Sequence, residues 1–379
     1  MDTLEKLSAL GAEARYDLCC GACGTQAGRR RDDIGRWIYP AVMPDGKRVA
    51  LLKVLQTNVC DNDCYYCATR RSNDVRRTAF SPDELARAFE DLALRGRVQG
   101  LFLSSGVAGS APRAMDRMLA TAELVRRKQG FRGYIHLKIL PGSSRAHVEQ
   151  AMRLADRVSV NLEAPNPECL SRIAPDKDFF AGLVQMMRWV HEVRQDSEAL
   201  SRVSQTTQLV VGAARESDAE ILRTAAWLYR EFGLSRVYYS AFQPQPGTPL
   251  AELPPTPPLR EHRLYQCDFL LRRYGFGLDE LPFDGSGFLS LSADPKTLWA
   301  MRHPQFFPIE VNRADVQHLL RVPGIGPKSA AQVVQARKQG RIRTLRDLRQ
   351  LGADAERAAP YVLLDGKRPP YQLPLWDRA

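Results

Sequence analysis

The sequence predicts an α/β protein, a partial (β/α)6 TIM-like barrel with a small all-α domain at its C-terminus. Short runs of β-branched and aromatic residues alternate with helix-like stretches after residue 48, which is the pattern of a parallel sheet covered by helices. The alternation ends at a proline-dense loop, QPQPGTPLAELPPTPP, which can continue neither element. The chain beyond this loop has the periodicity of short helices.

Six strands are predicted, and helix-like stretches separate them. A capping box at Ser81 and Glu84 marks the start of one such helix, and another ends at Gly233, as helices commonly do. Strands that alternate with helices in this way imply right-handed crossovers and a sheet that is either open or curled into a partial barrel. The predicted strands are residues 49–57, 100–105, 134–140, 157–163, 206–212 and 236–242.

Polar residues alternate with apolar ones along two neighbouring strands. In 134–140 the period of two places Tyr134, His136 and Lys138 on one face, and strand 157–163 shows the same alternation. A closed eight-stranded barrel fills its interior with branched apolar side chains. We therefore expect an incomplete barrel whose interior is a solvated ligand cavity. The alternative is a pair of edge strands with one solvated face.

The length of 379 residues exceeds one typical domain. No stretch approaches the roughly 18 apolar residues of a membrane-spanning helix, and the first residues lack the apolar core of a secretion signal. We therefore expect a cytoplasmic protein that does not engage a membrane. The predicted segments are a cysteine-containing extension (1–44), a core with the six strands (45–258), a helical bridge (259–308), a basic helical module (309–365) and a tail (366–379).

The chain is basic, with 54 Lys and Arg against 43 Asp and Glu and a formal net charge of +11. Residues 310–352 hold nine basic and three acidic residues, so over half of the excess lies in about a ninth of the chain. A general enrichment in arginine would spread the charge more evenly. The concentration favours a local module that binds a polyanion.

Three cysteines follow the first predicted strand in a C-x3-C-x2-C pattern: Cys60, Cys64 and Cys67. Thiolates so spaced can surround one metal centre, and soft sulfur ligands favour zinc or iron–sulfur. A structural zinc site needs four ligands, and no second cysteine pair or histidine pair follows at zinc-finger spacing. Three ligands on a four-iron cluster instead leave one iron open. An iron–sulfur centre is favoured over structural zinc.

These residues resemble the radical S-adenosylmethionine (SAM) superfamily over about residues 45–250, with Tyr66 just before the third cysteine. The resemblance implies a 4Fe–4S cluster on Cys60, Cys64 and Cys67, with SAM bound at the open iron. It assigns the remaining cofactor contacts to Ser104, Ser105 and Gly106 for the amino group, to Asn161 and Glu163 in a ribose-binding motif, and to Gly212 and Phe242 beside the adenine. The two serines and the missing acid after the second strand depart from the family pattern.

The resemblance also implies the reaction type. One electron, from a donor such as a flavodoxin, would split SAM into methionine and a 5′-deoxyadenosyl radical, which takes a hydrogen atom from the substrate. The protein must orient the substrate and exclude water. His136 and Lys138 are the candidate substrate contacts, and a solvated strand face is the alternative for both.

The basic module contains a glycine-rich turn between two helix-like arms, in Pro323, Gly324, Ile325, Gly326 and Lys328. The glycines let backbone N–H groups approach a phosphate at the positive end of the next helix, and the lysine can neutralise it. The turn resembles the helix-hairpin-helix family of DNA-binding modules, which implies sequence-independent contacts to the phosphate backbone. The alternative is a Pro-Gly turn in a helical pair used for protein contacts.

The two motifs occur together with the stretches YDLCCGACG, RRSNDVRR, RGYIHLKILPG, REHRLYQ and DPKTLWAMRHPQFFPIEVNRAD. With these stretches, nearly the whole chain resembles a bacterial family of radical SAM proteins assigned to DNA modification or repair, whose genes accompany one for a uracil-DNA-glycosylase-like protein. The resemblance implies DNA as a partner and that protein as a further one. Three alternatives stay open: an RNA substrate, a small-molecule substrate, and a non-catalytic nucleic-acid-binding protein with a structural metal site.

The remaining cysteines fall into two groups. Cys19, Cys20 and Cys23 could hold a second cluster, lend a fourth thiolate to the first, or lie near the cavity mouth without a function. Cys169 and Cys267 stand alone and are expected to be small buried hydrophobic residues.

Overall fold

The computed structural model describes residues 1–14, 37–42 and 48–371. The chain divides into two compact units, each described by itself. The barrel unit comprises Met1–Glu216 and Trp227–Thr256, and the helical unit comprises Ser217–Ala226 and Pro257–Ala379. Cys19, Cys20 and Cys23 lie outside the described residues.

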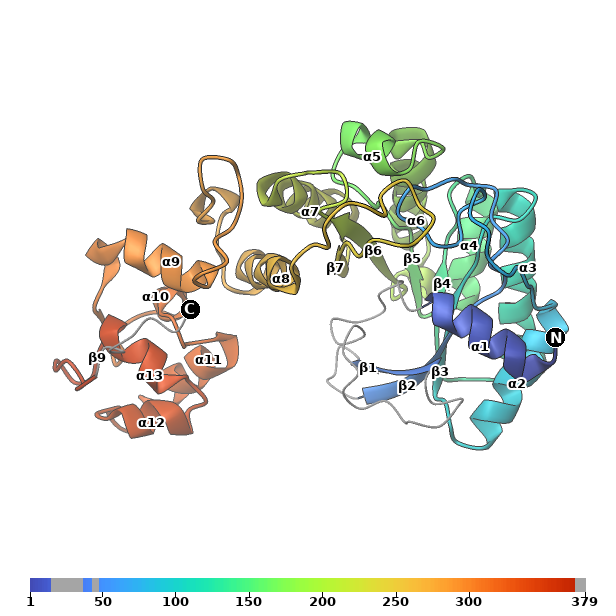
Figure 1. Ribbon diagram of the computed structural model, residues 1–379. Coiled ribbons are helices and arrows are strands. Elements are labelled where there is room, and N and C mark those ends of the chain that lie inside the picture. The colour runs from blue at the N-terminus through green and yellow to red at the C-terminus, as the bar shows by residue number, and fades with distance from the viewer. Residues whose placement is uncertain (15–36, 43–47, 372–379) are drawn as a thin grey trace. The chain divides into compact units, whose positions relative to one another are not determined.

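The barrel unit is built on a seven-stranded sheet whose strands follow chain order (Figure 1). The six strands β2 to β7 are parallel, and the curled sheet confirms the predicted partial barrel. An additional strand, β1, pairs antiparallel with β2 at one end of this order. The strands are β1 (Ile38–Val42), β2 (Arg48–Leu55), β3 (Gly100–Ser104), β4 (Tyr134–Lys138), β5 (Arg157–Ser159), β6 (Ser204–Val211) and β7 (Arg236–Ala241). Strand β5 is shorter than predicted because residues 160–162 leave the ladder, and Glu163 pairs with Leu209 of β6 only through an isolated bridge.

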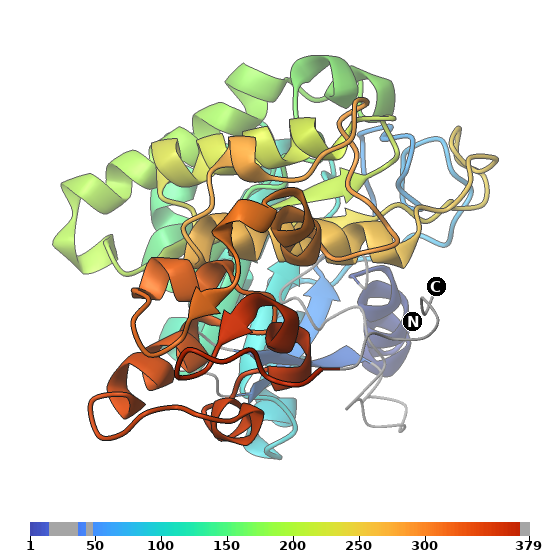
Figure 2. The same ribbon diagram turned by 90° about the vertical axis from the view of Figure 1, so that its left-hand side faces the viewer.

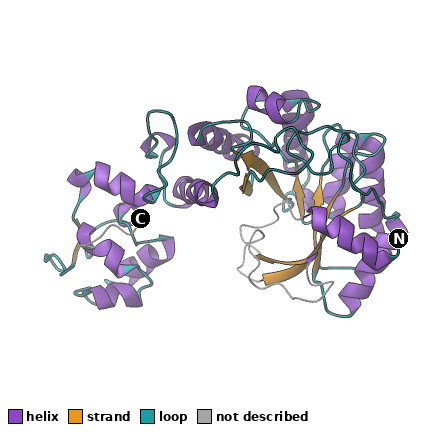
Figure 3. Cartoon of the chain, viewed as in Figure 1, coloured by secondary structure: helices purple, strands orange, loops and turns teal. Residues whose placement is uncertain are grey.

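Helices run along one side of this sheet (Figure 3). Several of these helices pack on one another, α2 on α3, α3 on α4 and α4 on α6. The predicted capping box at Ser81 and Glu84 is present at the start of α2. The helices are α1 (Thr3–Glu13), α2 (Pro82–Leu94), α3 (Ala111–Glu123) with a π-helical turn (Leu124–Lys128), α4 (Arg145–Leu154), α5 (Pro167–Ile173), a second π-helical turn (Phe179–Val184), α6 (Gln185–Asp196) and a 3-10 turn (Glu198–Leu200). Helix α7 (Asp218–Phe232) begins in the Ser217–Ala226 segment of the helical unit and ends in the barrel unit.

Both faces of β4 are buried. Ile135 and Leu137 are fully buried on one face, and His136 and Lys138 are buried on the other. Strand β4 lies between β3 and β5, so the interpretation of 134–140 as an edge strand with a solvated face is wrong. The polar side chains face partners from the next strand segment instead. His136 Nε2 lies 2.8 Å from Ser159 Oγ, and Lys138 donates to the side chain of Asn161.

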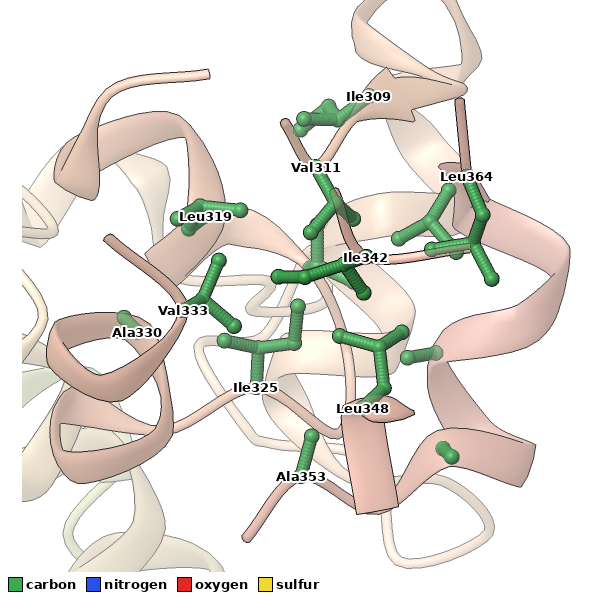
Figure 4. Packing of buried hydrophobic residues seen from close by; sticks show 14 of the residues in the cluster. Ile309, Val311, Leu319, Ile325, Ala330, Val333, Ile342, Leu348, Ala353 and Leu364 are labelled. Carbon is green, nitrogen blue, oxygen red and sulfur yellow. The ribbon is translucent and has the colours of Figure 1, made fainter. Parts of the chain in front are cut away.

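The helical unit packs short helices around an apolar core that includes Leu319, Ile325, Val333 and Leu348 (Figure 4). Its elements, drawn from gold through orange to red in Figure 2, are α8 (Pro258–Arg273), a 3-10 turn (Leu278–Glu280), α9 (Pro295–Arg302), a 3-10 turn (Pro304–Phe306), α10 (Val316–Arg321), α11 (Pro327–Ala336), α12 (Leu345–Gln350), α13 (Ala355–Ala358) and a 3-10 turn (Ala359–Tyr361). A short parallel pair, β8 (Ile309–Glu310) with β9 (Val362–Leu363), adds strands to a module predicted as all-α. None of the described helices is long and apolar enough to cross a bilayer.

Candidate active site

The loop that carries the three cysteines follows β2 and is held by its own hydrogen bonds. The guanidinium group of Arg77 donates to four backbone carbonyls of this loop, those of Asn58, Thr69, Arg70 and Asn73, at 2.6 to 2.9 Å. The buried Asn58 side chain donates to Arg76 O at 2.8 Å and accepts from Thr78 N at 2.7 Å. The sequence Asn58–Thr78 therefore closes into one compact loop at the carboxyl end of β2.

An ion pair between the half-buried Asp63 and the buried Arg70 fixes the segment between the first and second cysteines. Asp63 accepts hydrogen bonds from the Arg70 guanidinium and from Ser72, and these bonds lower the pKa of Asp63 to about 2. The Arg70 side chain also lies over the ring of Tyr65, 5.5 Å from its centroid. The carboxylate thus stays ionised and holds both ends of the turn that presents Cys64.

Cys60, Cys64 and Cys67 are free thiols. Cys60 Sγ accepts from Val107 N at 3.5 Å, and Cys67 Sγ lies 3.3 Å from Thr69 Oγ1. Burial raises the pKa of the Cys64 thiol to about 12, and it also raises the pKa of Cys67. The nearby charge of Lys177 opposes this rise in the pKa of Cys64, whereas the side chains of Cys67 and Cys60 add to it.

This donor set fits an iron–sulfur cluster. A thiolate is the form that binds metal, and buried thiols reach that form when a positive centre compensates their charge. Three soft sulfur donors on one loop match the ligation of a cluster by cysteines. Among the described residues, no three His, Cys, Asp or Glu side chains are grouped so that they could hold a single metal ion.

The turn after β3 lies directly against the cysteine loop. Gly106 N donates to Thr57 O at 2.8 Å, and Asp61 N donates to Val107 O at 2.7 Å. A Cβ atom at Gly106 would lie 2.3 Å from Val59 O and 3.2 Å from Cys60 Cβ, so only glycine allows this approach. Ser104 and Ser105 precede it, and Ser105 Oγ donates to Gly106 O at 2.8 Å.

Glu163 and Tyr66 meet on Lys177, a residue that the sequence did not single out. Lys177 Nζ donates to Glu163 Oε1 at 2.9 Å and to the Tyr66 hydroxyl at 3.4 Å. Burial opposes the charge on Lys177, but the Glu163 carboxylate together with the side chains of Cys64 and Cys67 outweighs burial and raises the pKa of the lysine. Burial and the same carboxylate raise the pKa of Tyr66 well above its usual range. The structure thus joins two predicted site residues, 97 positions apart, through a buried cation.

The other predicted cofactor residues also follow their strands at this edge of the sheet. Asn161 lies beyond β5 and accepts from Lys138. Gly212 follows β6 with a φ of +93°, and its N–H donates to the buried carboxylate of Glu216. Phe242 follows β7, is buried, and bonds through its N–H to Val211 O at 2.9 Å.

Two groups of residues at this site were not predicted from the sequence. Arg77 and the Asp63–Arg70 pair lie in the same sequence segment as the cysteines. An acidic residue and two arginines so close to a metal-binding motif could have indicated a loop that is held by an ion pair and hydrogen bonds. Lys177 lies in Ala-Pro-Asp-Lys-Asp after α5 and carries no local signal, because its role depends on contacts through space.

The glycine-rich turn of the helical unit joins α10 to α11. Gly324 has a φ of +85°, and a Cβ atom there would lie 2.3 Å from Asp354 O. Gly326 N donates to Ser329 Oγ at 2.8 Å, so a phosphate at this N–H would replace the serine hydroxyl. Pro323 and Ile325 are buried in the hairpin. Lys328 is exposed, as a phosphate contact requires.

Comparison with known proteins supports both sites. The model of the radical SAM superfamily matches residues 54–228, and the model of the helix-hairpin-helix motif matches residues 306–353. The chain is similar to tRNA-2-methylthio-N(6)-dimethylallyladenosine synthase of Bacillus pumilus (strain SAFR-032), with 24% identity over 56% of this chain and 42% of that protein. It is also similar to the threonylcarbamoyladenosine tRNA methylthiotransferase MtaB of Thermotoga maritima, with 24% identity over 51% of this chain and 44% of that one. The chain spans less than half the length of these curated relatives.

Solved structures with a similar arrangement include the FeFe-hydrogenase maturase HydG from Carboxydothermus hydrogenoformans, at 16% identity and a TM-score of 0.44 over 57% of this chain and 50% of that one. Methylornithine synthase (PylB) is similar at 16% identity and a TM-score of 0.46, over 57% of this chain and 60% of that one.

The matched superfamily confirms the predicted enzyme class and the two predicted cofactors, a 4Fe–4S cluster and SAM. The resemblance to a DNA modification or repair family stays a prediction. The chain therefore carries a radical SAM domain over residues 54–228 and a helix-hairpin-helix motif over residues 306–353.

Proposed function

We propose that this enzyme modifies a nucleic acid, with DNA as the first candidate. The observation that carries the proposal is the presence, in one chain, of the cysteine site and a helix-hairpin-helix motif with an exposed Lys328. Hairpins of this kind hold the phosphate backbone without reading bases, so they would deliver a polymer to the site without selecting its sequence. The choice of the attacked nucleotide would fall to the barrel unit.

Cys60, Cys64 and Cys67 would hold the 4Fe–4S cluster. When bound, the cluster and SAM supply a 5′-deoxyadenosyl radical that removes a hydrogen atom from the substrate. The residues of this chain would position the groups and keep water out. The Lys177–Glu163 pair would hold an ammonium group and a carboxylate in fixed positions beside the thiols. Gly106 would keep the turn after β3 close enough to cover Cys60.

His136 and Lys138 would contact the substrate from inside the barrel. Burial, with the nearby charges of Arg157 and Lys138, lowers the pKa of His136 well below its usual range, so the imidazole is neutral near pH 7. Its Nε2 faces Ser159, whereas its buried Nδ1 has no hydrogen-bond partner in the described part of the chain. The predicted interior cavity remains part of this proposal.

RNA is the second candidate, and one observation favours it. The curated relatives named above carry names that describe modification of tRNA adenosines. Their similarity to this chain is 24% identity over about half of its length, which supports the reaction type more than the substrate. An electron donor such as a flavodoxin, a uracil-DNA-glycosylase-like partner and a cytoplasmic location stay predictions.

Labelled substrates would test the proposal. The reduced, cluster-loaded enzyme would be given SAM with deuterated duplex DNA, single-stranded DNA or tRNA, and released 5′-deoxyadenosine would be analysed for deuterium. Incorporation from DNA supports the first candidate, and incorporation from tRNA alone supports the second. Incorporation from neither polymer, with active cleavage of SAM, would overturn a nucleic-acid substrate.

The variant Cys64→Ala provides the control for the cluster. It should lose iron and the reductive release of 5′-deoxyadenosine, because two thiols cannot hold the cluster with an open iron. Cys267→Ala is the matched variant, since Cys267 is also buried but lies on α8 in the helical unit. It should keep its iron.

A further inference from the structure

A hollow lies in the barrel unit at the sheet edge opposite the cysteines. It is formed by the turns that precede β4, β5 and β6, around residues 130–132, 153–156 and 199–203, and its volume is about 600 Å³. The strands are parallel, so their amino ends lie at one edge and the carboxyl ends, where the cysteine loop follows β2, at the other. This hollow therefore plays no part in the site described above.

The lining of this hollow is strongly basic, with five arginines and one aspartate. That aspartate, Asp156, is already engaged, because its carboxylate accepts from Arg126 and from Ile135 N, both at 2.8 Å. Arg126 also donates to the carbonyls of Leu154, Phe131 and Gly133 at 2.8 to 3.0 Å, so its guanidinium group stabilises the turns around the hollow. Neither residue of this pair can neutralise the other arginines.

Three of the arginines are uncompensated. Arg132, Arg153 and Arg202 are exposed, and none makes a hydrogen bond or ion pair within residues 1–14, 37–42 and 48–371. Arg127 is exposed and pairs with Glu123 at 3.0 Å on the surface. Like charges that converge on one hollow raise a positive potential there, which an anion relieves. Guanidinium groups bind phosphate through paired donors, so a phosphorylated ligand is the anion they fit.

The floor of the hollow is apolar. Met152, Leu154 and Val203 are buried there, and the half-buried ring of Phe131 lies at its side. A site for inorganic phosphate alone needs no such floor, whereas a nucleotide offers an aromatic base to the apolar surface and phosphates to the arginines. The volume lies within the range of small-molecule sites. A groove that tracks a nucleic-acid backbone would instead continue across the surface.

We infer that this hollow is a binding site for a nucleoside di- or triphosphate, with the base on the apolar floor and the phosphates on Arg132, Arg153 and Arg202. The inference does not depend on the proposed function, since it concerns the opposite edge of the sheet.

Calorimetric titration of the full chain with ADP and GDP tests this inference. Excess SAM is present throughout, so that the cofactor site is occupied and cannot take the adenine. We expect saturable binding, weaker binding of pyrophosphate, and no measurable binding of adenosine. The variant Arg153→Ala/Arg202→Ala should weaken nucleotide binding at least about tenfold, since each lost charge-assisted contact contributes substantially.

Two controls keep the outcome clear. Arg87→Ala removes an exposed arginine of α2 outside the hollow and should leave binding unchanged. The melting temperature of the double variant should equal that of the parent, because the two side chains make no contact that stabilises the fold. The absence of saturable binding, or equal affinity in the double variant, overturns the inference. Duplex DNA that binds through these arginines while neither nucleotide binds would overturn it as well and assign the hollow to a nucleic acid.

Discussion

Lys177 Nζ lies 2.9 Å from a carboxylate oxygen of Glu163, and less than a tenth of either side chain is exposed. Glu163 has a φ of +66°, in the left-handed region that favours glycine. Its backbone is fixed by bonds to Gln208 O and from Val210 N, at 2.9 and 2.8 Å. The left-handed backbone and the buried ion pair together fix the Glu163 carboxylate in one position.

The first prediction concerns this pair. Lys177→Met should destabilise the cluster-free chain by about 3–5 kcal/mol, because it leaves the Glu163 carboxylate buried without its cation. Urea denaturation followed by circular dichroism measures the change. The double variant Lys177→Met/Glu163→Gln should recover much of the loss, since no unpaired charge remains. Equal stability of the single and double variants would contradict the pairing. Arg95→Ala, which breaks an exposed pair with Asp91, should have little effect.

A second prediction concerns the close approach at Gly106. Gly106→Ala places a methyl group 2.3 Å from Val59 O, a backbone atom that can move only with the cysteine loop. We expect a loss of about 1–3 kcal/mol in stability and a several-fold lower iron content after anaerobic reconstitution. Ser105→Ala is the control, because it removes only the hydroxyl that donates to Gly106 O. A normal iron content in Gly106→Ala would show that the loop tolerates the shift.

Local sequence pattern was sufficient to predict the features that repeat or are closely spaced along the chain. The six parallel strands were predicted because β-branched runs recur between helices, and the three cysteines because their spacing is that of a metal motif. Strand β1 escaped because it contains Pro40, which argues against a strand except at a sheet edge, where β1 lies. Lys177 escaped because its partners are 14 and 111 positions away.

The hairpin shows a different limit. The glycines were assigned to phosphate contacts, yet the backbone of Gly324 packs against Asp354, and Gly326 N is bonded to Ser329. A glycine in a turn can be required by close packing as well as by a ligand. The residue that packs against Gly324 lies 30 positions later in the sequence, so the local pattern does not indicate it. Lys328 is exposed, so its substitution should change ligand binding without changing the packing of the hairpin.

The third prediction therefore separates binding from folding in the helical unit. Lys328→Ala should weaken binding of duplex DNA several-fold and lower the salt-dependence slope by about one, with an unchanged melting temperature. Fluorescence anisotropy across a series of KCl concentrations measures both quantities. Gly324→Ala should weaken binding and also destabilise the unit, because an L-residue at φ +85° meets Asp354 O. Lys367→Ala, an exposed lysine outside the matched motif, is the control. An unchanged slope in Lys328→Ala would remove the lysine from the interface.

The last prediction concerns Lys296, a buried lysine of α9 that holds the same hairpin. Its Nζ donates to Ile325 O at 2.6 Å and lies 4.7 Å from the centroid of the Tyr274 ring. Burial, with the charge of Arg357 and more weakly that of Arg321, lowers the pKa of Lys296 to about 7, although Asp294 opposes the shift.

Since the ordinary value is 10.5, the unfolded chain binds one more proton than the folded chain between about pH 7 and pH 10.5. The stability of the helical unit should therefore rise with pH in this window, by up to about 1.4 kcal/mol per pH unit, and the cost of burying the charge is fully present below pH 7. Hydrogen exchange of the amides in α11 at several pH values measures this, and Lys296→Met removes the slope. Lys328→Met, at an exposed position of the same unit, should retain it. Parallel pH profiles for the parent and Lys296→Met would mean that Lys296 stays charged in the folded protein and that the carbonyl of Ile325 is enough to hold that charge.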